Sequence, residues 1–389
     1  MCSRFLLLIL FSAIFFNSYS QNIELERYKH HSDSLLYSTH LGYSRHISVT
    51  VPFDFQEGLN QSYPLIIIFD KQNTRSYQYL IRSIDYLTSN EQMPACVIIG
   101  VGSEMEHRYF ETQYIESDSS AFGHKNELFV LKELIPLAKS SLKTSDFSLL
   151  AGHSRYGFFT TAMFLKFPND IQAVIASSPV FSQKNYDLLP LFEEIKEINI
   201  SGTRYYRYGI GNDYPEEFTR FDNRFEKQKV TNNKYNIKGT LFPEADHNVT
   251  PGLTATSALY EIFEYWSRMQ NIYLDNSMDN LSMLSSLNDS IINHYGIDIA
   301  FSLGILNGKG WYFANEKRYS EAIDAWKILL KHYPNFSEAY LYIMYAHAES
   351  GFPSVEYHQV FTQNLKSSSL YSAEEKEELM NEFRDLIKK

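Results

Sequence analysis

A serine at position 154 stands between an apolar run, 147–151, and a segment with a helical pattern, 158–167. A sharp turn between a buried strand and a helix exposes a serine hydroxyl at the edge of a sheet, and Gly152, two residues earlier, prevents a clash in that turn. The helix that follows directs its backbone N–H groups, including that of Arg155, toward the same point, where they can stabilise an oxyanion. The pattern predicts that Ser154 is a nucleophile on such an elbow.

Tyr156 departs from the usual elbow pattern, in which a glycine stands two residues after the serine. Here that glycine comes one position later, as Gly157. A tyrosine at this position needs room beside a neighbouring strand. We therefore expect the turn to shift locally or to differ from the usual one.

A serine nucleophile needs a general base, because its hydroxyl is almost entirely protonated near pH 7. In the α/β-hydrolase order the base comes last in the chain. His247 follows the predicted strand 235–242 and precedes the predicted helix 254–269. We predict His247 as the base and expect His153, next to the nucleophile, to point elsewhere.

The base is normally oriented by a carboxylate. The predicted strand 204–210 is followed by Gly-Asn-Asp-Tyr-Pro-Glu-Glu, which offers Asp213 as first choice and Glu216 as second. Two alternatives stay open: these acids form only a surface turn, or the site works as a Ser–His dyad.

The loop after an early strand usually provides a second oxyanion donor. In this chain it reads Phe-Asp-Lys-Gln, so the backbone N–H of Lys71 or Gln72 is the candidate, although a glycine would fit more easily. The sequence lacks His-Glu-x-x-His, paired cysteines and a glycine-rich phosphate loop. We therefore predict neither a metal nor a cofactor.

These residues each follow a predicted strand. Between about 45 and 267, short apolar runs alternate with helical patterns, and several runs are continuously apolar. Strands of that kind are typical of a parallel sheet covered on both faces, the doubly wound α/β class. Ligands bind such sheets at the carboxyl ends of the strands, where all the candidates lie.

The chain after residue 267 has helical patterns and no strand pattern. Six of its residues fall at the spacing of a 34-residue tetratricopeptide repeat: Leu306, Gly310, Phe313, Ala322, Trp326 and Pro334. We predict three parts: a signal peptide at 1–20, an α/β-hydrolase domain at 21–267 and a small all-α domain at 268–389. The last is either a protein-binding module or a helical hairpin without a peptide groove.

The N-terminal segment has the order of a secretory signal. Arg4 precedes an apolar run, 5–16, and small residues precede a cut after Ser20. This predicts export to a periplasm or out of the cell, with no membrane span in the mature chain. The net charge is −11 and basic runs are absent, which argues against a nucleic-acid partner.

Five motifs together resemble the putative esterase family, which includes esterase D-like, ferric-siderophore and feruloyl esterases. In order they are Tyr63-Pro64-Leu65-Ile66-Ile67-Ile68-Phe69-Asp70, Glu133-Leu134-Ile135-Pro136, Ala151-Gly152-His153-Ser154, Ser177-Ser178-Pro179 and Asp246-His247. The resemblance covers about residues 40–267. It implies an α/β-hydrolase fold and cofactor-free ester hydrolysis, with Ser154 as nucleophile and His247 as base. Lys71 and Tyr156 depart from the family pattern, and the helical tail resembles tetratricopeptide extensions of exported bacterial members.

Two functions of different classes follow. The first is a serine carboxylic ester hydrolase that acts through an acyl-enzyme on a small-molecule ester of siderophore or carbohydrate type. The second is an inactive hydrolase fold that binds a protein partner through its helical repeat, a reading favoured by Tyr156 and Lys71.

Overall fold

The computed structural model describes residues 25–55, 62–115, 121–184, 186–195, 199–226, 234–275, 281–368 and 370–388. The segment predicted as a signal peptide, 1–20, lies outside these residues.

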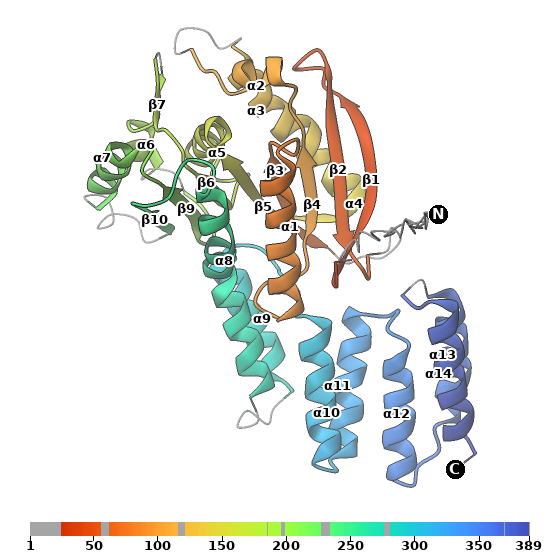
Figure 1. Cartoon of the computed structure of the whole chain (residues 1–389). Coiled ribbons are helices and arrows are strands. Elements are labelled where there is room, and N and C mark those ends of the chain that lie inside the picture. The colour runs from red at the N-terminus through yellow and green to blue at the C-terminus, as the bar shows by residue number, and fades with distance from the viewer. Residues whose placement is uncertain are drawn as a thin grey trace, which may run out of the picture.

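A single eight-stranded sheet, ordered β1-β2-β4-β3-β5-β6-β9-β10, forms the centre of the N-terminal part (Figure 1). Its strands are β1 (Tyr28–Tyr37), β2 (Ser44–Pro52), β3 (Tyr63–Phe69), β4 (Val97–Val101), β5 (Thr144–His153), β6 (Ala173–Ser177), β9 (Arg204–Ile210) and β10 (Tyr235–Leu241). The pairs β1–β2 and β2–β4 are antiparallel, and the other neighbours are parallel. The predicted mostly parallel α/β class is confirmed.

Helices and short strands connect these elements. They are α1 (Thr74–Ser89), α2 (Met105–Glu111), α3 (Phe122–Leu128), the π-helical turn η1 (Phe129–Leu134), α4 (Ile135–Leu142), α5 (Arg155–Lys166), the hairpin β7 (Ser182–Gln183) and β8 (Tyr186–Asp187), α6 (Leu191–Glu194), α7 (Pro215–Glu226) and α8 (Thr250–Leu274). The elements α3, η1 and α4 follow one another without a break and wind through the π turn near Pro136, whose missing N–H interrupts the α-helical ladder.

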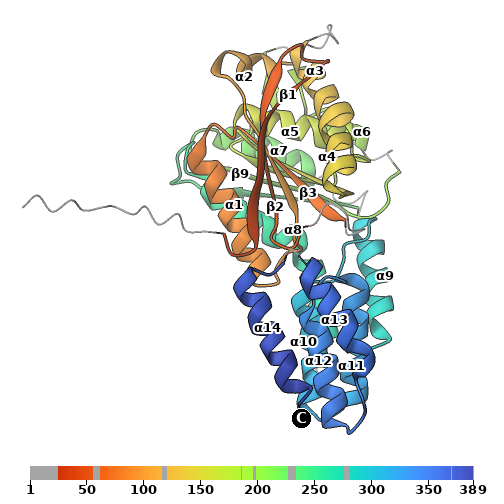
Figure 2. The ribbon, with the colours of Figure 1, turned by 90° about the vertical axis from the view of Figure 1, so that its right-hand side faces the viewer.

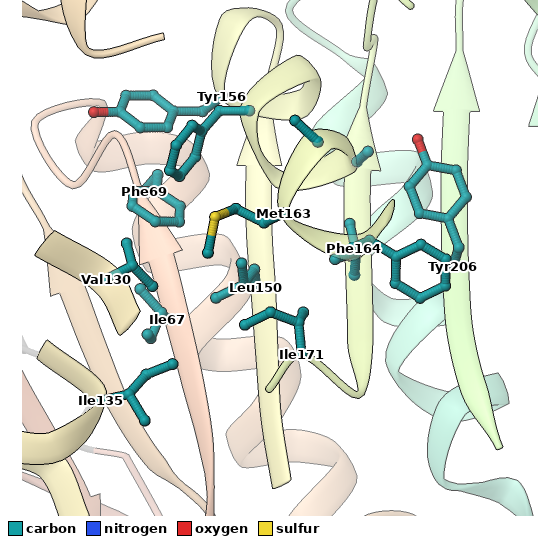
Figure 3. Packing of buried hydrophobic residues seen from close by; sticks show 14 of the residues in the cluster. Ile67, Phe69, Val130, Ile135, Leu150, Tyr156, Met163, Phe164, Ile171 and Tyr206 are labelled. Carbon is teal, nitrogen blue, oxygen red and sulfur yellow. The ribbon is translucent and has the colours of Figure 1, made fainter. Parts of the chain in front are cut away.

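The central strands are buried on both faces, which explains why they are apolar at consecutive positions. In β3, Ile66 and Ile68 belong to the apolar cluster under α1 and α8, whereas Ile67 and Phe69 belong to the opposite cluster. Figure 3 shows the second cluster, with Met163 and Phe164 of α5 packed against β3, β5, β6 and β9. Period-two alternation thus divides one apolar run between two cores.

The edge strand β1 was not predicted from the sequence. Its residues are mostly polar and exposed, and its register with β2 shifts between His30 and Ser32. Figure 2 shows β1 at the uncovered margin of the sheet. A polar edge strand is defined by the strand it pairs with and by the few side chains that face the core. Neither can be recognised from local amino-acid composition, so the sequence shows no strand pattern here.

The C-terminal part is helical. It comprises α9 (Met283–Tyr295), α10 (Leu303–Asn315), α11 (Tyr319–His332), α12 (Glu338–Glu349), α13 (Val355–Ser367) and α14 (Ala373–Leu386). Between α10 and α11, a Cβ on Gly310 would lie 2.2 Å from the indole nitrogen of Trp326, so the two helices meet where the sequence places a residue without a side chain. None of the described helices is long and apolar enough to cross a membrane.

Helix α8 belongs to both parts of the molecule. It begins at the carboxyl ends of the strands and runs for 25 residues down to the helical region (Figure 1). The expected boundary at 267–268 falls inside this helix. Its apolar side chains join one cluster that extends from β3 and α1 to α10, α11 and α12. The helical region therefore packs directly against the amino-end side of the sheet, far from the strand ends that carry the candidate residues.

Candidate active site

Ser154 occupies a strained turn at the carboxyl end of β5. Its φ is 59° and its ψ is −118°, a conformation that a non-glycine residue rarely adopts. Its N–H donates to the carbonyl of Ser177, at 2.8 Å, at the end of the neighbouring strand β6, and its carbonyl accepts from Phe158 in α5. The predicted strand–turn–helix context is therefore present, and the hydroxyl stands on its apex.

The glycine before the serine is required by this geometry. A Cβ on Gly152 would lie 2.3 Å from the backbone carbonyl oxygen of Tyr156, a contact that no side chain tolerates. A Cβ on Gly157 would lie 3.2 Å from atoms of Pro179 and from the carbonyl oxygen of Ser177. The glycine thus allows α5 to approach the end of β6 closely.

His247 lies in the loop between β10 and α8. Its Nδ1 lies 2.5 Å from Oδ2 of Asp213, in the loop after β9. The two side chains are 31% and 14% exposed. Burial acts to raise the pKa of the Asp213 carboxyl, but the hydrogen bond and charge of His247, together with hydrogen bonds from the backbone and from Ser178, outweigh burial and hold this pKa below its ordinary value. The carboxylate is therefore ionised near neutral pH and orients the imidazole so that Nε2, which has no hydrogen-bond partner among the described residues, is left for the nucleophile.

The two loops that carry this pair are tied together by their backbones. The N–H of Asn212 donates to the carbonyl of Ala245 at 2.8 Å, and that of Gly211 donates to Oδ1 of Asp213 at 3.1 Å. A Cβ on Gly211 would lie 2.3 Å from the Ala245 oxygen, so only glycine permits this approach. The ring of Tyr214 packs edge-on against His247, with centroids 5.8 Å apart.

Glu216, the second choice for the acid, lies in the first turn of α7 and is exposed. The structure brings Asp213, and not Glu216, to His247. The loop holds Asp213 in this place, because the N–H of Gly211 binds Oδ1 and leaves Oδ2 for His247.

His153 does not point away from the site, contrary to our expectation. Its Nε2 donates to the backbone carbonyl of His247 at 2.8 Å, and the two rings lie 4.5 Å apart. Burial, followed by the proximity of His247, lowers the pKa of His153 to about 4. A neutral His153 with its proton on Nε2 thus holds the loop of the candidate base beside the nucleophile.

The two predicted oxyanion donors differ in whether their backbone N–H groups already have a hydrogen-bond acceptor. The N–H of Arg155 begins α5 and has no acceptor among the described residues, so it remains available. The N–H of Lys71 instead donates to the carbonyl of Val101 at 3.1 Å, which extends the β3–β4 ladder by one bond. Because that N–H is already engaged, the prediction for Lys71 is wrong, and Gln72 is the candidate left in this loop.

Tyr156 fills a buried space between the elbow and β3. Its fully buried ring stacks on Phe69 at 4.7 Å, visible in Figure 3, and its hydroxyl contacts Ser103, Arg45 and Glu111. Arg45 and Glu111 form an ion pair at 3.3 Å with side chains 1% and 0% exposed. Tyr156, which stands where the usual elbow has a glycine, is therefore the centre of a buried polar cluster.

Helix α2 covers this cluster and was not predicted from the sequence. Its Arg108 forms two hydrogen bonds with Asp70, at 2.8 and 2.6 Å, and reaches the carbonyl of His153 at 3.4 Å. Asp70 follows β3 and has a φ of 61°. The only sign of this contact in the sequence was Asp70 itself. A carboxylate directly after an apolar strand is expected to be buried, and a buried carboxylate needs a cation from another segment.

The candidate nucleophile and base follow β5 and β10, which are separated by β6 and β9 in the sheet, but their loops meet at the same edge and belong to one site. The carbonyl of His247 accepts bonds from both His153 and Thr250, and Thr250 contacts the hydroxyl of Ser178, next to Ser177. Among the described residues no hydrogen bond joins Ser154 Oγ to His247 Nε2. Catalytic hydrogen bonds are often long before substrate binds, so this arrangement still suits proton transfer from serine to imidazole.

The Putative esterase family model matches residues 38–235, just over half of the chain. The chain belongs to this family. Membership makes it an ester hydrolase, and the matched range contains Ser154 and Asp213, while His247 lies beyond it. No curated protein matches the chain by sequence.

Solved structures share the fold at low sequence identity. An IroE-like serine hydrolase from Shewanella oneidensis has a TM-score of 0.63 at 15% identity, covering 78% of this chain and 100% of that one. An uncharacterised protein from Capnocytophaga ochracea has a TM-score of 0.58 at 14% identity, covering 85% and 93%. The BES protein from Bacillus cereus has a TM-score of 0.51 at 18% identity, covering 62% and 98%.

Proposed function

We propose that this esterase is a serine carboxylic ester hydrolase that acts through an acyl-enzyme. Ser154 Oγ attacks the ester carbonyl while His247 Nε2 takes its proton. The tetrahedral intermediate collapses as the C–O bond to the alcohol breaks, and the imidazolium returns the proton to the departing alkoxide. Water then attacks the acyl-enzyme, with His247 again as base, and releases the acid and free Ser154.

One observation carries the proposal: a strained, glycine-flanked serine and an aspartate-bound histidine stand at the same carboxyl edge of the sheet. Asp213 favours the imidazolium that forms during attack, since the carboxylate lies 2.5 Å from Nδ1. The N–H of Arg155 at the start of α5 supports an oxyanion hole. The similarity in fold to the IroE-like serine hydrolase from Shewanella oneidensis agrees with this mechanism.

A fluorophosphonate probe tests the nucleophile. We expect the purified protein to be labelled at Ser154 and to hydrolyse a chromogenic short-chain ester. Ser154→Ala removes labelling and lowers kcat by at least about 10⁴-fold, whereas Ser286→Ala on α9 changes neither. Folded protein that stays unlabelled contradicts the mechanism and favours a binding role through the helical region.

We also propose that the chain is exported, that its helical region is a tetratricopeptide-like unit that binds a protein partner, and that its substrate is a siderophore-type or carbohydrate ester. The repeat spacing and the close approach of Gly310 to Trp326 support the helical assignment. Hydrolysis of a panel of catecholate and acylated-sugar esters, compared by kcat/KM, distinguishes the two substrate classes.

A further inference from the structure

A cationic group without a carboxylate partner lies directly beside the nucleophile. The guanidinium of Arg155 lies 3.9 Å from the ring centroid of Tyr109 on α2. Among the described residues no carboxylate forms an ion pair with it. Because successive Cα atoms are about 3.8 Å apart, this side chain begins within one residue of the reacting hydroxyl.

The neighbouring cations are neutralised. Arg108 is paired with Asp70 at 2.6 Å, and Lys71 is paired with Asp33 at 2.7 Å. A third cation, Arg45, is buried against Glu111. An added negative charge at the mouth of the site would therefore meet Arg155 without having to displace a carboxylate of the described part of the chain.

The ring of Tyr109 keeps Arg155 in place. A guanidinium stacked on an aromatic face is pre-organised, so its N–H edge loses little conformational entropy when it binds an anion. Tyr109 and the adjacent Phe110 are 47% and 51% exposed, and Met105 on the same helix is 86% exposed. Helix α2 thus presents apolar and aromatic surface next to the charge.

We propose that Arg155 and Tyr109 form a subsite for an anionic group of the substrate, a carboxylate or phenolate attached to an aryl or alkyl part of the ester. The charge lies within one side-chain length of the scissile bond, and the apolar part lies on α2. This proposal rests on the proposed function, because it concerns the substrate of the same serine.

Matched ester pairs test the subsite. Charge on the acyl side is probed with aryl monoesters of glutarate against the same aryl esters of valerate. Charge on the alcohol side is probed with 4-acetoxybenzoate against its methyl ester. For each pair the readout is the ratio of kcat/KM for the charged ester to that for the neutral one, which cancels general effects on Ser154.

The decisive variant is Arg155→Gln. We expect it to lower this ratio about tenfold for at least one pair, the size typical of a charge-assisted contact in a partly exposed site. Arg155→Lys keeps the charge without the planar stack and should give an intermediate ratio. Tyr109→Ala should lower the ratio severalfold, whereas Tyr109→Phe, which keeps the ring face, should not.

Arg268→Gln is the matched control. Arg268 also lies over a tyrosine, Tyr265, at 4.9 Å, but it lies 18 residues along α8 from Thr250, roughly 27 Å from the site. It removes the same charge and the same kind of contact. We expect it to leave the ratio at the wild-type value, which separates a local subsite from the effect of net charge.

Ionic strength provides an independent readout. Added salt should reduce the wild-type ratio and should have little effect in Arg155→Gln, because screening acts on an exposed charge pair. A ratio that is the same in wild type and Arg155→Gln for both pairs overturns the subsite, provided that Ser154-dependent hydrolysis is present. Loss of all hydrolysis and of Ser154 labelling in the wild type would instead overturn the proposed function.

Discussion

The two ends of α8 lie in contrasting environments. At its N-terminus, Asp70, Ser154 and Ser178 follow three neighbouring strands, all with positive φ, and a buried ion pair lies behind the elbow. At its C-terminal half the helix packs into an apolar cluster with α10 and α11. Glycine serves both ends, but beside Ser154 it permits a strained turn, whereas at Gly310 it permits two regular helices to touch.

This difference shows that the destabilising features of the fold, backbone strain and buried charge, are concentrated near the active site. Backbone strain and buried charge each destabilise a fold unless the surrounding structure fixes them, and they gather at functional sites. Among its described residues the helical end has fewer of both, the buried cation Lys309 and the positive φ of Lys317, and is held mainly by packing between regular helices. Changes at the site end should therefore alter catalysis or the buried ion pair, and changes at the helical end should alter stability alone.

Asp213→Asn should have the largest effect. Loss of the carboxylate leaves His247 without its partner and in the wrong tautomer, so we expect kcat to fall about 10²- to 10⁴-fold with little change in Tm. Glu216→Gln, at an exposed position in the first turn of α7, should leave kcat within about twofold. Equal effects of the two variants in a steady-state ester assay would remove the basis for choosing Asp213.

Glu111→Gln breaks the buried ion pair at the site end. It leaves the guanidinium of Arg45 buried without a counter-charge, so the free energy of unfolding should fall by about 3–5 kcal/mol in urea titrations. Asp385→Asn in the helical region removes an ion pair with Lys388 whose side chains are 73% and 74% exposed. This variant should change the free energy of unfolding by less than about 1 kcal/mol. A small effect of Glu111→Gln would show that the cluster around Tyr156 is not a stabilising anchor.

His153→Gln tests the pH dependence of the site end. Because the pKa of His153 is lowered to about 4, the unfolded chain binds a proton between about pH 4 and 6.5 that the folded protein does not. The folded protein therefore loses stability as the pH falls through this window, by about 2 kcal/mol at pH 5. The glutamine variant should lack this loss, and parallel stability curves of the two proteins between pH 7 and pH 5 would contradict it.

Gly310→Ala addresses the helical end and should have the smallest effect. Its Cβ would overlap the indole of Trp326, which costs about 1–3 kcal/mol, and the gain in helix propensity offsets about 1 kcal/mol of this. We expect Tm to fall by a few degrees while kcat per folded molecule stays unchanged. A large loss of activity without a change in Tm would show that the helical region communicates with the site.

The sequence by itself determined the elements whose residues are chemically or periodically distinctive. Continuous apolar runs predicted the central strands, because both faces of a parallel sheet are buried. Gly152 and Ser154 predicted the elbow, and chain order predicted His247. Spacing also placed Gly310 where two helices come together, since only the smallest residues allow that contact.

The tertiary structure alone decided the contacts between distant segments. Local patterns ranked Asp213 before Glu216 without excluding either, and the contact of Asp213 with His247 separated them. They also left unknown that the N–H of Lys71 extends a ladder and that Tyr156 meets Arg45, which is 111 residues away in the chain. Such outcomes depend on which partner lies across a strand end or a helix face, and no residue's own type or neighbours encode that.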